Sequence, residues 1–155
     1  MDIYAYIMAD HRKVASLIDE LLGINLQAVQ QRLFEDIKAE LTLHAQAEER
    51  TFYRAIVEAA RATSTERDIR HAVHDHNEIR QLVQRLTDEA ITSPKWMVTF
   101  GELKHAIEHH VQEEESDVFA EARTLLAPVT AVALAEEMDR LKQTLKAEMP
   151  VQAAD

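Results

Sequence analysis

A short motif that occurs twice places the strongest constraint on this chain. Each copy has an apolar residue, a His three positions later, a Glu four positions after the His, a second Glu beside it, and then an apolar pair. On a helix, a His and a Glu four residues apart share one face, and apolar residues in phase turn that face toward a core. Each half of the chain is therefore predicted to point one imidazole and one carboxylate inward. The copies are Leu41, His44, Glu48, Glu49, Phe52 and Tyr53, and Ile107, His110, Glu114, Glu115, Val118 and Phe119.

Inward-facing carboxylates need a partner, because a charged Glu is rarely buried unless it is paired or bound to a metal ion. A single His-Glu motif would indicate no more than surface charge, since such pairs occur on many solvated helices. Here two copies lie in phase with apolar residues, and His11 and His76 add two further histidines within predicted helices. The pattern therefore favours a metal site between facing helices of a bundle.

The spacing of apolar residues predicts an all-α fold. Because the connections are short, consecutive helices should be antiparallel neighbours. We expect an up-down antiparallel four-helix bundle over about residues 2–126, with an additional C-terminal helix, in one domain of residues 1–155. The predicted helices are 2–22, 26–62, 66–91, 94–126 and 130–147, followed by a tail at 148–155.

Several helix ends have their own signals. Gly23 is a plausible stop for the first helix, and Asn25 a plausible cap for the second. Thr63 and Glu66 have the spacing of a capping box for the third helix. The Ser-Pro pair at 93–94 predicts a helix that begins with a side-chain cap and a proline in its first turn.

The inward residues have the composition of a metal site with two positions. Counted from the predicted turns, the four histidines lie at one height in the bundle, within a turn or two. Four imidazoles and two carboxylates suit iron, manganese or zinc, whereas a single tetrahedral zinc would leave two ligands unused. A bridged dinuclear site is predicted, with iron as the first choice and zinc or manganese left open. Its ligands are His11, His44, Glu48, His76, His110 and Glu114.

Composition narrows the range of functions. The chain has no cysteine, which excludes disulfides, thiolate metal sites and cysteine nucleophiles and fits a reducing compartment. A formal net charge of −11 makes nucleic acid and anionic membrane surfaces unfavourable partners. Neither a leader sequence nor an apolar run of membrane-spanning length is visible, so a cytoplasmic location is expected.

Four stretches together resemble the hemerythrin-like, or HHE cation-binding, domains. They are DHRKVASLIDEL (10–21), HAQAEERTFY (44–53), DHNEIRQLVQRL (75–86) and HVQEEESDVF (110–119). The resemblance implies a four-helix bundle with two non-haem irons, held by histidines and bridged by two carboxylates. Members of the family variously bind or sense dioxygen, hold iron, or handle nitric oxide and peroxide. On this resemblance the four histidines His11, His44, His76 and His110 match the ligands, and Glu48 and Glu114 match the bridges.

The sequence departs from the oxygen-carrying hemerythrins at one position. Those proteins have a further histidine one turn before the third-helix ligand, where this chain has Ala72. Water, a displaced His74, Tyr4 or Tyr6 would then complete the site, and an open position would favour reactivity over tight dioxygen carriage. The remaining acidic and histidine neighbours are expected at the surface or in contact with the ligands. They are His71, His105, His109, Glu49, Glu113 and Glu115.

Three functions remain in competition at this point. The first is a di-iron protein that acts on dioxygen, peroxide or nitric oxide as a sensor, store or detoxifier. The second is an enzyme proper, with a catalase-like or oxidase activity. The alternative is a helical interaction module with a structural zinc and no redox activity. The ferritin-like order, Glu-x-x-His, is reversed here and ranks lower. Any protein partner is unknown.

Overall fold

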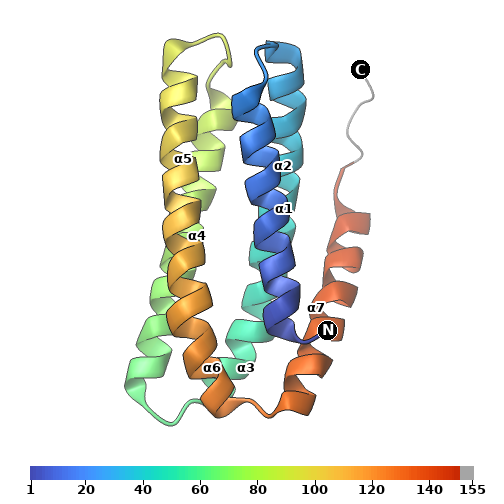
Figure 1. Cartoon of the computed structure of the whole chain (residues 1–155), viewed down its shortest axis with the longest axis vertical. Coiled ribbons are helices and arrows are strands. Elements are labelled where there is room, and N and C mark those ends of the chain that lie inside the picture. The colour runs from blue at the N-terminus through green and yellow to red at the C-terminus, as the bar shows by residue number, and fades with distance from the viewer. Residues whose placement is uncertain (151–155) are drawn as a thin grey trace.

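A computed structural model of the chain describes residues 1–150, which form helices and no strand (Figure 1). The predicted all-α fold is confirmed. Two of the helical rods change from α to π geometry part of the way along, so they carry several labels. In chain order the elements are α1 (Ile3–Gly23), α2 (Gln27–Glu48), η1 (Glu49–Tyr53), α3 (Arg54–Ala59), α4 (Thr63–Asp88), α5 (Pro94–Glu113), η2 (Glu114–Val118), α6 (Phe119–Leu125) and α7 (Pro128–Glu148).

The predicted bundle and its additional C-terminal helix are both present. Helix α1 packs on α2, and α4 packs on α5, so the bundle consists of two antiparallel helix pairs. Helix α7 lies outside the bundle, along α1 and α2 and not along α4 and α5 (Figure 1). The two pairs therefore have different surroundings, and only the first pair is covered by a fifth helix.

The core consists of two apolar clusters separated by a polar layer. One cluster contains Tyr4, Phe52 and Phe119 together with residues of α7. The other contains Phe34 and Trp96, whose rings meet edge to face at 5.5 Å. On each bundle helix the two clusters take residues on opposite sides of the inward histidine. The histidines are thus held between two packed apolar blocks.

The two rods with the His-Glu motif widen into π turns, one just after Glu48 and the other at Glu114. Segment η1 begins at Glu49 and η2 begins at Glu114. In a π turn, a residue five positions on returns to nearly the same face, so Tyr53 turns inward beside Glu48. A continuous α-helix over 26–62 was expected, and a period of 3.6 residues does not reveal this change.

The helix-end predictions were partly right. Ser93 caps α5 by accepting a hydrogen bond from the Lys95 amide, with Pro94 at the first position, as expected. The predicted Asn25 cap is wrong, because Leu26 occupies the cap position and no side chain caps α2.

The predicted capping box is also wrong, since α4 already includes Thr63 and has Ala62 at its cap position. The first turn of α4 is held instead by a tertiary contact, the hydrogen bond that buried Thr65 donates to Glu121 of α6. Helix α1 does end at Gly23, although the glycine has no positive φ and the chain leaves through an extended Ile24.

Candidate metal centre

The polar layer brings together all six side chains that the sequence predicted as ligands. They form two overlapping groups, in each of which one ligand atom per residue lies within 4.8 Å of the others. The carboxylates of Glu48 and Glu114 belong to both groups and have no exposed side-chain surface. The first group adds His11 and His44, and the second adds His76 and His110.

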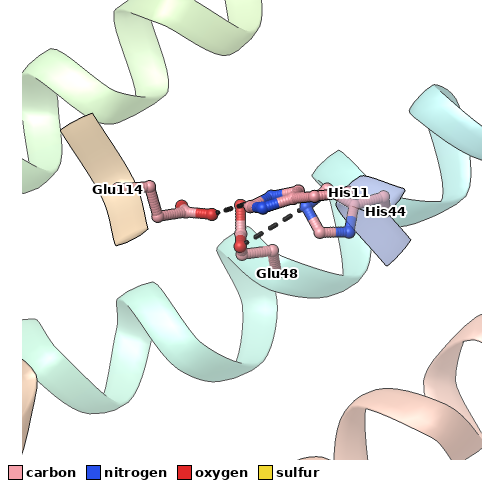
Figure 2. A group of neighbouring side chains, drawn as sticks. All are labelled: His11, His44, Glu48 and Glu114. Carbon is pink, nitrogen blue, oxygen red and sulfur yellow. Dashed lines mark ion pairs between the residues drawn. The ribbon is translucent and has the colours of Figure 1, made fainter. Parts of the chain in front are cut away.

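The two oxygens of each carboxylate are divided between the two histidine pairs. On the first side, His11 Nε2 lies 3.1 Å from Glu114 Oε1, and His44 Nε2 lies 3.4 Å from Glu48 Oε2 (Figure 2). On the second side, the other oxygens approach the other rings. His76 Nε2 lies 3.1 Å from Glu48 Oε1, and His110 Nε2 lies 3.6 Å from Glu114 Oε2. Each carboxylate therefore faces both histidine pairs, with a different oxygen toward each.

Most of these inward atoms have no hydrogen bond among the described residues. His11 Nε2, His44 Nε2, both oxygens of Glu48 and Glu114 Oε1 are buried without a partner. Such atoms cost free energy unless something else satisfies them. Two ligands held at about 2.1 Å and at right angles on one ion lie about 3 Å apart, close to the separations found here. The donor set therefore fits cations held between the rings.

The outer nitrogen of every ring meets a carboxylate from a neighbouring helix or turn. A carboxylate accepts hydrogen bonds, so each Nδ1–H donates. A ring that has lost its second proton then presents the Nε2 lone pair inward, as a metal ligand requires. The pairs are His11–Glu115 at 2.7 Å, His44–Asp10 at 2.8 Å, His76–Glu49 at 2.6 Å and His110–Asp75 at 3.4 Å. Glu49 and Glu115 thus contact the ligands, as expected of them.

Sequence reasoning missed the roles of Asp10 and Asp75. Each immediately precedes a ligand histidine but orients the ring on the next helix along, which is His44 for Asp10 and His110 for Asp75. The repeated Asp-His pair in the two halves was a signal that could have identified them. Their contacts cross between helices, so the partner itself could not be read from spacing.

Tyr53 was also missed, since it was read as half of an apolar pair. Its hydroxyl donates to Glu114 Oε2, and its ring stacks on His76 at 5.4 Å. Burial, with the nearby charges of Glu114 and Glu48, raises the pKa of Tyr53 well above its ordinary value. The phenol therefore stays protonated at neutral pH. Tyr53 and Ala72 belong to the same apolar cluster. Tyr53 therefore lies on the same side of the polar layer as Ala72, where the oxygen carriers have their further histidine.

Two of the residues proposed to complete the site, His74 and Tyr6, bind other partners. His74 is exposed and lies 3.2 Å from Glu78. The Tyr6 hydroxyl donates to Asp139 of α7 at 2.9 Å. Tyr4 is buried against Phe52 and Phe119. The other off-face histidines are exposed, as expected, and they are His71, His105 and His109.

Protonation balances the buried carboxylates when no cation is present. Burial by itself lowers the pKa of His44, but Glu48 and Asp10 more than offset it and raise the pKa to about 10. His76 behaves alike, with Glu48 and Glu49 raising its pKa to about 9. Burial raises the pKa of Glu48, yet the two rings bring it well below its ordinary value. Cation binding must therefore displace protons.

A cavity of about 250 Å³ opens onto the rings from between α2 and α4. Its inner end is formed by the four ligand histidines and its walls are largely apolar. The basic side chains Lys38 and Arg80 also line it. The apolar wall residues are Val14, Leu41, Ala45, Ile79, Val83, Ile107 and Val111, and the other polar ones are Asp10, Thr42, Gln46 and Gln84.

The chain matches the family model described as the Hemerythrin HHE cation binding domain over residues 2–122. It therefore belongs to this family, and the resemblance inferred from the four motifs is confirmed. A crystal structure of an HHE cation binding domain-containing protein, the Rv2633c homolog from Mycobacterium kansasii, has the same fold. The TM-score is 0.84 at 18% identity, and the alignment covers 96% of this chain and 89% of that one.

A curated relative has a different description. The chain is 28% identical over 153 residues to a protein of Nostoc sp. strain PCC 7120 named DNA nickase. The match takes in 99% of this chain and 42% of that protein, so the chain spans less than half of the relative's length.

Within residues 1–150, no helix combines the length and the hydropathy that are needed to span a membrane.

Proposed function

We propose that this chain binds two metal ions, iron in the first instance, with Glu48 and Glu114 as bridges. One observation carries the proposal: each carboxylate directs one oxygen to each histidine pair, and most of the inward atoms have no hydrogen-bond partner. One pair is His11 and His44. The other is His76 and His110.

An iron pair, when bound, supplies Lewis acidity and accessible redox changes. The chain's own residues would orient it and limit access to it. The Nδ1 partners fix the ring tautomers, and the Tyr53 phenol holds one bridging carboxylate through Glu114 Oε2. The apolar blocks on both sides keep the ligands from bulk water.

The small molecule proposed to react here is dioxygen, peroxide or nitric oxide. The supporting feature is the cavity of about 250 Å³, which is largely apolar and ends on the four rings. Small uncharged molecules enter apolar space at little cost, whereas bare ions do not. We propose a sensor, store or detoxifier, with catalase-like turnover as the enzymatic form, in a cytoplasmic setting.

Metal analysis and an absorption spectrum test this proposal directly. Protein expressed without added metal should contain about two ions per chain, as the shared bridges require. An iron pair should colour the protein and give near-ultraviolet bands that change with peroxide or nitric oxide. At most one ion in a folded sample would refute the dinuclear site. A colourless, zinc-loaded and inert protein would support the alternative, an interaction module with a structural metal.

The DNA-cutting activity implied by the relative's name is not carried over. More than half of that relative lies outside the match, and a net charge of −11 opposes binding to phosphate backbones. A plasmid-nicking assay with the metal-loaded protein is a simple check. If the metal-loaded protein nicks the plasmid and removal of the metal abolishes the nicking, nucleic acid would have to be considered a substrate.

A further inference from the structure

The two helix pairs differ on the face next to Asp10 and Asp75. Beside Asp10, helix α7 covers the surface, and Lys142 binds the carboxylate at 2.8 Å (Figure 1). The residues on that face are mostly buried or bonded to α7. They are Ile3, Tyr6, Leu43, Ala47 and Thr51.

The matching positions beside Asp75 have the opposite chemistry. Among residues 1–150, no fifth helix lies there (Figure 1). Histidines and carboxylates stand at the positions that match the residues covered by α7. His71 Nε2 lies 3.2 Å from Glu113 Oε2 and 3.8 Å from Asp75 Oδ1. His109 Nε2 lies 3.2 Å from the other Glu113 oxygen. The corresponding residues, which we call the α4–α5 acidic face, are Asp68, His71, Asp75, His109, Glu113 and Asp117.

Folding stability gives little reason for this arrangement. His71, His109 and Glu113 are exposed by 57%, 57% and 37% of their side-chain surface. Exposed ion pairs of this kind contribute only about 0–1 kcal/mol. The first helix pair meets the same structural demand with apolar residues and α7. The acidic face is therefore open for another purpose.

A cavity of about 300 Å³ connects the acidic face with the candidate centre. Asp68, Asp117 and the group of His71, Asp75 and Glu113 line its outer part. The buried side chains of His110 and Glu114, whose Nε2 and Oε2 lie 3.6 Å apart, also line it. The described lining contains no Lys or Arg. The apolar cavity between α2 and α4, by contrast, is lined by Lys38 and Arg80.

We propose that the α4–α5 acidic face is the port through which a divalent metal ion reaches the centre. This inference rests on the proposed function. His71, Asp75 and Glu113 capture the ion first, with the N and O ligands that suit Fe(II). The surrounding carboxylates raise the local cation concentration and lower the cost of leaving water. The ion then passes to Glu114 and His110 at the inner end, while small uncharged molecules use the apolar cavity.

The test measures how fast metal-free protein takes up Co(II), and Fe(II) without air, by stopped-flow absorption. The variant His71→Ala with Glu113→Gln should load about tenfold more slowly, as expected when an acidic steering surface is lost, and should still reach the unmodified final metal content. The matched control is His74→Ala with Glu78→Gln, which removes an exposed His-Glu pair on α4 outside the cavity lining and should load at the normal rate.

A second variant and an equilibrium measurement keep the test independent of folding defects. Asp68→Asn with Asp117→Asn leaves the capturing group intact and should slow loading by a smaller factor. Fully loaded wild-type protein should bind one further Co(II) weakly, and the His71→Ala, Glu113→Gln variant should not. Equal loading rates, or a lower final content in that variant, would overturn the port. Failure of the wild type to take up two ions would instead overturn the centre itself.

Discussion

The α1/α2 pair and the α4/α5 pair supply the same five groups, which are one Asp, two His and two Glu. Asp10, His11 and His44 correspond to Asp75, His76 and His110, and the two Glu-Glu pairs correspond as well. The two π turns lie within one residue of the same place in their halves. What differs is the layer around these groups. Tyr53 stands where the other half has Phe119, and α7 covers only the first pair.

The two helix pairs are therefore alike in the groups that point inward and unlike in the residues that surround those groups. The two proposed ion positions should therefore bind alike and react differently. The second position, between His76 and His110, has the Tyr53 phenol and the open acidic face. The first position has Lys142 and α7 behind it.

The largest effect is expected from the shared bridges. Glu48→Gln and Glu114→Gln each remove charge from both positions at once, so each variant should lose most of both ions. Elemental analysis of folded protein measures this, with exposed Glu58→Gln as the control. A variant that lost only one ion would show that its carboxylate binds the ion at one position only. That result would contradict the proposal that both carboxylates are shared by the two ions.

Metal removal should come next in size. Without cations, five of the inward atoms are buried without a hydrogen-bond partner, and bound metal stabilises the folded state by mass action. Chelation should lower Tm by several degrees or more, since each kcal/mol shifts Tm by about 2–4 °C in a chain of this size. Equal melting curves after confirmed metal removal would contradict the proposed centre.

The carboxylates behind the rings test the two halves against each other. Asp10→Asn and Asp75→Asn should each weaken metal binding by about 10–100-fold, because the Nδ1 partner that orients the ring becomes neutral. The loss should be greater for Asp10, whose 2.8 Å contact with His44 is shorter than the 3.4 Å contact of Asp75 with His110. Competition with a metal indicator gives both affinities. Equal losses would mean that contact length does not matter here.

The pH dependence of stability should separate the empty protein from the loaded one. The pKa values of His44 and His76 are raised to about 10 and about 9 in the folded state, against about 6.5 in an unfolded chain. Their contribution is thus complete below about 6.5 and is lost as pH rises through the folded values. Tm of the empty protein should fall over that interval more steeply than Tm of the loaded protein. Parallel curves would contradict these shifts.

The smallest effect is expected from Tyr53, which differs from its counterpart Phe119 by one hydroxyl group. Tyr53→Phe makes the first half resemble the second, which has Phe119 at this place. It also removes the hydrogen bond to Glu114, at a cost of about 1–3 kcal/mol for a buried group left unpaired. Metal content should hold, while the absorption spectrum of the loaded protein should change. Tyr6→Phe removes a similar bond to Asp139 and should leave the spectrum unchanged. An unaltered spectrum in Tyr53→Phe would mean the phenol does not influence the ions.

The sequence by itself determined the helices, their order and the six inward groups. These follow from local rules, because a period near 3.6 fixes which residues share a face and short turns fix which helices are neighbours. His44 with Glu48 and His110 with Glu114 could be identified in this way. Helix ends were less secure, as Asn25 and Thr63 show, because a tertiary contact can replace a local cap.

Only the tertiary structure decided which groups meet across helices. Asp10 reaches His44, and Asp75 reaches His110, through contacts between helices that no spacing within one helix encodes. The π turn that brings Tyr53 inward changes the helical phase at a single place, so a regular period passes over it. The position of α7 was decided the same way, since its apolar face fits one helix pair and leaves the other open to solvent.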